Sequence, residues 1–271
     1  MKFAICNETF QDWPFDKAFA FARQCGYTGI EFAPFTINKN AYAISADRRR
    51  EIRRQAEDAG LTVVGLHWLL AFTEGYYLTS PEADVRRRTS EYLGELARLC
   101  RDLGGKVLVL GSPKQRNLLP GVTHDQAMEY AADVLRGVVP TLEECGVVLA
   151  AEPLGPEEGD FLRTAELGVR LIQMVDSPHC RLHLDVKAMS TEQRPIAEII
   201  RQSAPWLVHF HANDPNLRGP GMGHVKFEPI AAALRETNYT GWVSVEVFDY
   251  TPDPDTIARE SREYLRGIFG E

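Results

Sequence analysis

Short apolar runs alternate with longer amphipathic segments along the whole chain. Eight of these runs are four or five residues long and rich in β-forming side chains: Phe3–Cys6, Gly29–Phe32, Thr62–Leu66, Lys106–Leu110, Val147–Ala151, Arg181–Asp185, Leu207–His211 and Val243–Val247. Runs of this length are typical of strands that are buried on both faces of a parallel sheet. The pattern therefore predicts eight parallel strands.

The segments between these runs have the periodicity and the stop signals of helices. Glycines follow several of them within one or two residues, at Gly26, Gly60, Gly104 and Gly146, where a left-handed residue commonly ends a helix. Thr123 is placed to cap the segment Asp125–Cys145. The expected helices are Asp16–Gln24, Ala46–Ala59, Pro81–Leu103, Asp125–Cys145, Thr164–Val175, Ile196–Ser203, Phe227–Thr237 and Asp255–Phe269.

Eight strand–helix units within 271 residues predict one closed (β/α)8 barrel, with residues 1–271 forming a single domain. No GxGxxG follows the first strand candidate, so an open dinucleotide-binding sheet lacks its motif. No linker or low-complexity segment interrupts the repeat. In (β/α)8 barrels the chemistry lies at the carboxyl ends of the strands and in the loops that follow.

Composition and charge limit the kinds of molecule that the protein is expected to bind. The formal net charge of −8 argues against nucleic acid, whose phosphates attract a basic surface. No apolar run approaches the roughly 18 residues of a membrane span. The chain starts without a signal-like segment, and its five cysteines are scattered without CxxC spacing. We therefore expect a cytoplasmic protein without a disulfide framework or a zinc–thiolate site.

The last four strand candidates each end at a residue that can bind a metal. These residues are Glu152, Asp185, His211 and Glu246. Packing gains nothing from burying three carboxylates together, whereas a cation makes their burial favourable. Three carboxylates and one imidazole suit Mn²⁺, with Co²⁺ and Mg²⁺ as alternatives, better than a structural zinc. The sequence thus predicts one divalent metal ion at this end of the barrel.

The tetrad and its surroundings resemble a known family. The four residues are separated by 33, 26 and 35 positions, and Glu152-Pro153-Leu154 and Pro220-Gly221-x-Gly223 flank them. This pattern is similar to that of the xylose-isomerase-like TIM-barrel sugar isomerases and epimerases. Within that family the ligand spacing is closest to the D-tagatose and D-psicose (allulose) 3-epimerases.

The resemblance implies a metal-dependent enzyme, an isomerase of the ketose 3-epimerase type, acting on a sugar or keto-polyol through a metal-stabilised cis-enediolate. Glu152 and Glu246 would be the acid–base pair on opposite faces of the substrate. Asp185 and His211 would be ligands only. Glu158 aligns with the glutamate that binds the substrate near its carbonyl group, and its alternative is a solvated loop carboxylate.

Two substrate-binding positions depart from the family pattern. Ala188 stands where the ketose 3-epimerases carry a histidine, and Leu217 stands where they carry an arginine, with Arg218 next to it. Lys187 replaces the missing histidine if its strand continues, because residues two apart in a strand point the same way. Otherwise it is a lysine at the barrel rim.

Further polar groups belong to the same end of the barrel. His67 beside Trp68 resembles a sugar platform, or else a core tryptophan with a capped histidine. Lys114 and Arg116 are candidates to contact a carboxylate, a phosphate or a second sugar, with a solvated basic turn as the alternative. The side chains of Glu8 and Glu31 fall on this face, and His183 and His209 are expected deeper, as hydrogen-bonded core histidines.

Several other functions fit the same scaffold. Inosose isomerases or dehydratases, hydroxypyruvate isomerases and lyases of 3-keto-glycosides, including the α subunits of C-glycoside deglycosidases, share the metal chemistry. An endonuclease IV-type nuclease would need about three metals and a less acidic surface. A non-catalytic sugar-binding barrel would leave Glu246 without a role. The assembly state is open, a homo-oligomer included.

Overall fold

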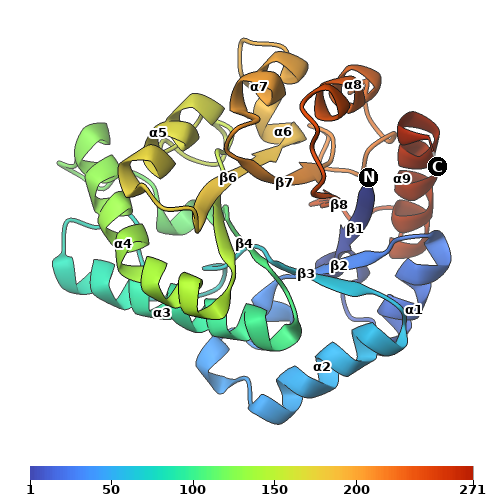
Figure 1. The fold of residues 1–271 in the computed structure, drawn as a ribbon, viewed down its shortest axis with the longest axis horizontal. Coiled ribbons are helices and arrows are strands. Elements are labelled where there is room, and N and C mark those ends of the chain that lie inside the picture. Colours follow the sequence, from blue (N-terminus) through green and yellow to red (C-terminus); the bar gives the residue numbers. More distant parts are fainter. Residues whose placement is uncertain (271) are drawn as a thin grey trace.

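The computed structural model describes residues 1–270, so the expected end of the domain at residue 271 lies outside it. Eight parallel strands form one closed barrel in chain order, as predicted (Figure 1). The predicted strand positions are all confirmed, with differences of one or two residues at the ends. The strands are β1 Lys2–Cys6, β2 Gly29–Phe32, β3 Thr62–Leu66, β4 Val107–Leu110, β5 Val148–Ala151, β6 Cys180–Asp185, β7 Leu207–Ala212 and β8 Trp242–Val245.

Helices surround the barrel on its outside (Figure 1). Each predicted helix is present: α1 Phe15–Cys25, α2 Ala46–Asp58, α3 Ala83–Leu103, α4 His124–Cys145, α5 Ala165–Val175, α7 Ile196–Ser203, α8 Glu228–Glu236 and α9 Pro254–Phe269. Thr123 caps α4 through a reciprocal hydrogen-bonded box with Gln126. Gly26, Gly104 and Gly146 end their helices in the left-handed conformation.

Short helical turns that the sequence pattern did not predict begin within three residues of the end of four strands. They are η1 (Asn7–Phe10), η2 (Pro34–Thr36), η4 (Pro113–Gln115) and α6 (Val186–Met189). Another short turn, η3, spans Ala41–Ala43. Turns this short carry too little periodicity to be seen in a sequence. Because strand ends bear the functional side chains in this fold, these turns set the direction of those side chains.

The strand register places the carboxyl ends of β6, β7 and β8 side by side. Asp185 of β6 pairs with His211 of β7, which pairs in turn with Ser244 of β8. A register shift between Leu182 and His183 places His183 opposite His209. Strand β8 ends at Val245, two residues earlier than expected, so Glu246 is the first residue beyond it.

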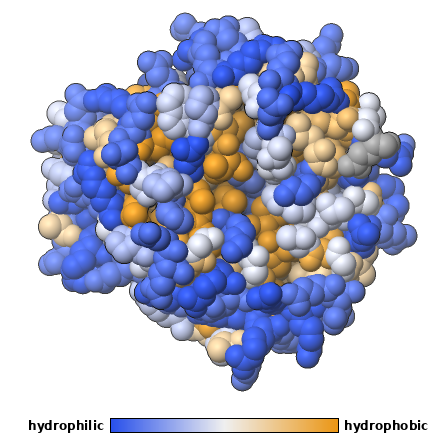
Figure 2. All heavy atoms as spheres, viewed as in Figure 1, coloured by the Kyte–Doolittle hydropathy of each residue, from blue (hydrophilic) through white to orange (hydrophobic). Residues whose placement is uncertain are grey.

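The surface is mostly hydrophilic around the rim of the face seen in Figure 2, with apolar residues toward its middle. The core is continuous between the barrel and the inner faces of the helices. Within residues 1–270, no helix has both the length and the apolar character needed to cross a membrane.

Candidate metal centre

The four predicted ligands lie together at the carboxyl ends of strands β5 to β8. Glu152, Asp185, His211 and Glu246 are all buried, with at most 5% of any of them exposed. Ligand atoms of Glu152, Asp185 and His211 lie within 4.8 Å of one another, together with a nitrogen of His183. The carboxylate of Glu246 joins this group through His211, with Oε2 3.0 Å from Nδ1.

The carboxylate of Asp185 is held by groups that the protein itself provides. Its Oδ1 accepts a hydrogen bond of 2.8 Å from the backbone N–H of Ala188, which makes Asp185 the N-cap of α6. Its Oδ2 accepts from the side-chain amide of Asn213, whose own oxygen accepts from the backbone N–H of Lys187 at 2.8 Å. Sequence reasoning missed Asn213, which lies one residue beyond the end of β7 and two residues after His211.

Gly111, just beyond the end of β4, makes room for Glu152. A Cβ at this position would lie 1.6 Å from Oε2 of Glu152 and 2.6 Å from its Cδ. Any side chain at residue 111 would therefore displace the carboxylate. The sequence pattern gave no sign of this role, because the glycine and the glutamate are far apart along the chain.

Arg116 holds the backbone that carries Glu152. Its guanidinium donates to the backbone oxygens of Glu152 at 2.7 Å and Leu110 at 3.2 Å. The residue is 2% exposed, so the expectation of a solvated basic turn is wrong for Arg116. Burial lowers the pKa of its guanidinium to about 10, against the opposing charges of Glu152 and Glu158. Of the two basic residues in this turn, Lys114 is the one that is exposed to solvent.

The electrostatics of the centre call for a cation. Burial, together with the charges of Glu246 and Asp185, raises the pKa of Glu152 well above its usual range. Burial and Glu246 raise the pKa of Asp185 to about 6. His211 lowers the pKa of Glu246 in spite of its burial. Crowded, desolvated carboxylates of this kind are stabilised by a divalent cation, and their oxygen-rich donor set fits the hard end of the divalent series.

A buried carboxylate fixes the orientation of His211. Both oxygens of Glu31, on β2, lie 3.3 Å from Nε2 of His211, which leaves Nδ1 facing Glu246. Glu31 also contacts Nε2 of His209 at 2.8 Å. Carboxylates that bind the far nitrogen of a ligating histidine fix its tautomer and increase its basicity.

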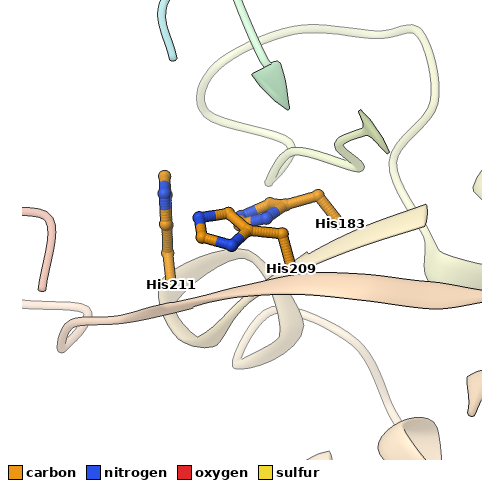
Figure 3. A group of neighbouring side chains, drawn as sticks. All are labelled: His183, His209 and His211. Atoms are coloured by element: carbon orange, nitrogen blue, oxygen red, sulfur yellow. The ribbon is translucent and has the colours of Figure 1, made fainter. Parts of the chain in front are cut away.

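The three histidines of β6 and β7 lie close together, with the ring of His211 standing to one side of His183 and His209 (Figure 3). The rings of His183 and His211 are 4.2 Å apart between centroids. His209 is hydrogen-bonded and fully buried, as expected. His183 is equally buried, but the expectation of a hydrogen bond is wrong, because neither ring nitrogen has one.

His67 and Trp68 lie at different depths. His67 is completely buried, with Nε2 2.9 Å from Oε2 of Glu8. Trp68 is half-buried and stacks on Phe248 with the ring centroids 5.7 Å apart. Trp68 and Lys114 both line a pocket of about 540 Å³. Of the two residues of the expected sugar platform, Trp68 thus lines an open pocket, whereas the imidazole of His67 is buried inside the barrel.

Ion pairs hold the other predicted substrate-binding residues, which are Lys187, Glu158 and Arg218. Lys187 lies on α6, so the expected continuation of strand β6 is wrong. Its ammonium still reaches the mouth of the barrel, 2.7 Å from Oε1 of Glu158 and over the ring of Phe248. Arg218 binds the loop after β8, with Nε 3.0 Å from Oδ2 of Asp249 and Nη2 donating to Thr251.

Comparison with known proteins agrees with this geometry. The family model described as "Xylose isomerase-like TIM barrel" matches residues 19–268. The chain belongs to this family. A D-psicose 3-epimerase of Agrobacterium fabrum is 35% identical over 234 residues, covering 82% of this chain and 75% of the relative. This member of the xylose isomerase-like family thus has ketose 3-epimerases among its homologues.

Two further similarities extend over the full length of the family fold. The 3-dehydro-D-guloside 4-epimerase of Escherichia coli K12 is 23% identical over 274 residues, covering 98% of this chain and 99% of the relative. A crystal structure of a D-psicose 3-epimerase in the presence of D-fructose superimposes with a TM-score of 0.87 and 23% identity, with 100% of each chain covered. At this identity the structural match confirms the fold.

Proposed function

We propose that this protein is a divalent-metal-dependent sugar epimerase of the ketose 3-epimerase type. The observation that supports it most is the placement of two buried carboxylates, Glu152 and Glu246, on either side of Asp185 and His211. Glu152, Asp185, His211 and Glu246 would hold the metal, for which we propose Mn²⁺ before Co²⁺ or Mg²⁺. The cation, when bound, would supply Lewis-acid stabilisation of negative charge on the substrate oxygens.

Glu152 and Glu246 would move the proton. One carboxylate removes the proton at C3 from one face of the ketose, and the other returns a proton to the opposite face, which inverts the configuration. Their side chains come from strand ends that are separated by β6 and β7. Arg116 and Gly111 keep Glu152 in place, and His211, which is held by Glu31, contacts Glu246.

Lys187 and Glu158 would bind the substrate near its carbonyl end. Their side chains form a partly buried pair at the mouth of the barrel. Because Ala188 provides no imidazole, the ammonium of Lys187 is the donor that would stabilise the enediolate oxygen. Trp68 and Phe248 would provide an apolar wall for the sugar carbons.

We expect deuterium to enter the substrate at C3 when a ketose is incubated with the Mn²⁺-loaded enzyme in heavy water. The proton taken from C3 exchanges with solvent before the opposite carboxylate returns one. Proton and deuterium NMR of the recovered sugars would locate the label. Deuterium at C1 alone, or at no carbon, would contradict the 3-epimerase proposal, and incubation without enzyme controls for spontaneous exchange.

Replacing Lys187 by methionine is expected to lower kcat/KM by a factor on the order of 10², because a preorganised donor to the developing oxyanion is lost. Methionine keeps the length and the contact with Phe248. Metal affinity, measured by calorimetry, should change little, since Lys187 is not one of the ligands. Unchanged kcat/KM would exclude the lysine from catalysis.

A 3-keto-glycoside is the second candidate substrate. Arg218 is already paired with Asp249, and Ala188 replaces the histidine, so two groups that bind free ketoses in the related enzymes are not available in the same form. The full-length similarity to a 3-dehydro-D-guloside 4-epimerase supports the same class of substrate. A panel of ketoses, inososes and 3-keto-glycosides assayed with Mn²⁺ would separate epimerisation, isomerisation and elimination.

A further inference from the structure

A second group of potential metal ligands lies beside the tetrad. It contains the thiol of Cys6 at the end of β1, the carboxylate of Glu8 in η1, an imidazole nitrogen of His67 after β3, and the carboxylate of Glu246. One ligand atom from each of these residues lies within 4.8 Å of the others. We call this group the Cys6–His67 cluster. It was not expected from the sequence, because its members come from three distant parts of the chain.

Among the described residues, the side-chain oxygens of Glu8 and the ring nitrogens of His67 make no hydrogen bond. Nε2 of His67 is 2.9 Å from Oε2 of Glu8, yet these two atoms do not meet in a hydrogen-bonding geometry. The second oxygen of Glu8 and Nδ1 of His67 also make no hydrogen bond. Both side chains are more than nine-tenths buried. Buried polar groups are nearly always bonded, so unpartnered lone pairs that face one another indicate a missing ligand.

The thiol completes the cluster. Cys6 is fully buried, and its Sγ lies 4.0 Å from Nε2 of His211 and 3.7 Å from Oγ of Ser244. These are long contacts even for sulfur. A buried thiol with two carboxylates and an imidazole around it is an unusual packing residue, but it is a suitable ligand once a cation is present.

We propose that Cys6, Glu8 and His67 bind a second divalent cation, with Glu246 shared between this site and the tetrad. The proposal rests on the metal centre of the proposed function. One thiolate, one imidazole and carboxylate oxygens favour a borderline-soft ion such as Zn²⁺ or Co²⁺, whereas the tetrad has only oxygens and one nitrogen. The two sites therefore differ in metal preference. His67 becomes a metal ligand in this arrangement and does not contact the sugar.

An internal ion pair is the competing explanation for the cluster. Protonated His67 would offset the charge of Glu8, since Cys6 and Glu8 raise the pKa of His67 well above its usual range despite burial. That pairing leaves Oε1 of Glu8 buried without a hydrogen bond, and Nδ1 of His67 has only a long contact of 3.9 Å with Oε1 of Glu31. A cation contacted by both side chains removes this cost.

Metal stoichiometry tests the proposal. The full-length protein, stripped with a chelator and dialysed against Zn²⁺ or Co²⁺, should retain about two cations per chain by elemental analysis, because each site holds its ion through several ligands. Cys6→Ser and His67→Gln should retain about one. Asp185→Asn should lose the tetrad ion and keep the second. Cys180→Ser, a buried cysteine far from the cluster, is the matched control and should behave like wild type.

Cobalt gives a spectroscopic readout of the second site. Co²⁺ bound by Cys6 should produce a thiolate-to-metal charge-transfer band in the near ultraviolet, which disappears in Cys6→Ser and persists in Asp185→Asn. One cation per chain in the wild-type protein, or two cations without this band, would overturn the proposal. Deuterium exchange at C3 reports on the tetrad, and the charge-transfer band reports on Cys6. Each can be observed without the other, so the failure of one proposal can be told from the failure of the other.

Discussion

Replacing Glu246 by glutamine is expected to reduce kcat by a factor of about 10²–10⁴, the usual contribution of a positioned acid or base. The amide has nearly the shape of the carboxylate but cannot accept or return a proton. It can still offer one oxygen to a cation, so the metal should be retained with weaker affinity. The measurements are kcat under saturating Mn²⁺ and metal affinity by calorimetry.

The comparison variant is Glu260→Gln, which makes the same chemical change at an exposed position in α9. It should match wild type in both measurements. If Glu246→Gln keeps its turnover when the metal site is saturated, the two-carboxylate mechanism is wrong. A loss of activity that extra Mn²⁺ restores would show that Glu246 acts only as a ligand.

Replacing Gly111 by alanine is expected to lower activity by about 10²-fold, the scale that a displacement of about 1 Å at a reacting group produces. The added methyl group would overlap Oε2 of Glu152, and the flexible end of that side chain would move away from the site. The fold should tolerate the change, because the clash is with a side chain rather than with backbone. Activity, metal affinity and thermal midpoint together distinguish displacement from unfolding.

Gly267→Ala in α9 is the matched control, since a Cβ there meets nothing within 4 Å. Alanine is favoured over glycine in a helix interior by up to about 1 kcal/mol, so this variant should be active and slightly more stable. Full activity in Gly111→Ala would show that Glu152 need not occupy its observed position. A large fall in the thermal midpoint would assign the effect to folding.

The barrel and the tetrad could both be predicted because they depend on local repetition. Consecutive residues show how long each strand is, where it ends and where each helix stops. Glu152, Asp185 and His211 could therefore be placed at strand ends without knowing the tertiary structure. The lysine at 187 was predicted at the mouth for a wrong reason, since its position follows from the helical turn of α6 and from its pairing with Glu158.

The supports of the site could not be predicted because they are tertiary contacts. Arg116 looks like a solvated residue in sequence, and only the closed barrel places its guanidinium under the backbone of Glu152. The contact between Glu31 and His211 joins residues that are 180 positions apart. The cytoplasmic location, the single domain and the assembly state stay predictions from composition and pattern.

The hydrogen bond between Asp185 and residue 188 uses the backbone N–H of Ala188 and is independent of its side chain. Mutation at this position can therefore change what the pocket recognises while the aspartate keeps its orientation. A substitution at residue 188 is therefore expected to leave the position of Asp185, and with it the affinity for a metal, unchanged. This main-chain contact therefore separates the choice of substrate at residue 188 from the positioning of the proposed metal ligand Asp185.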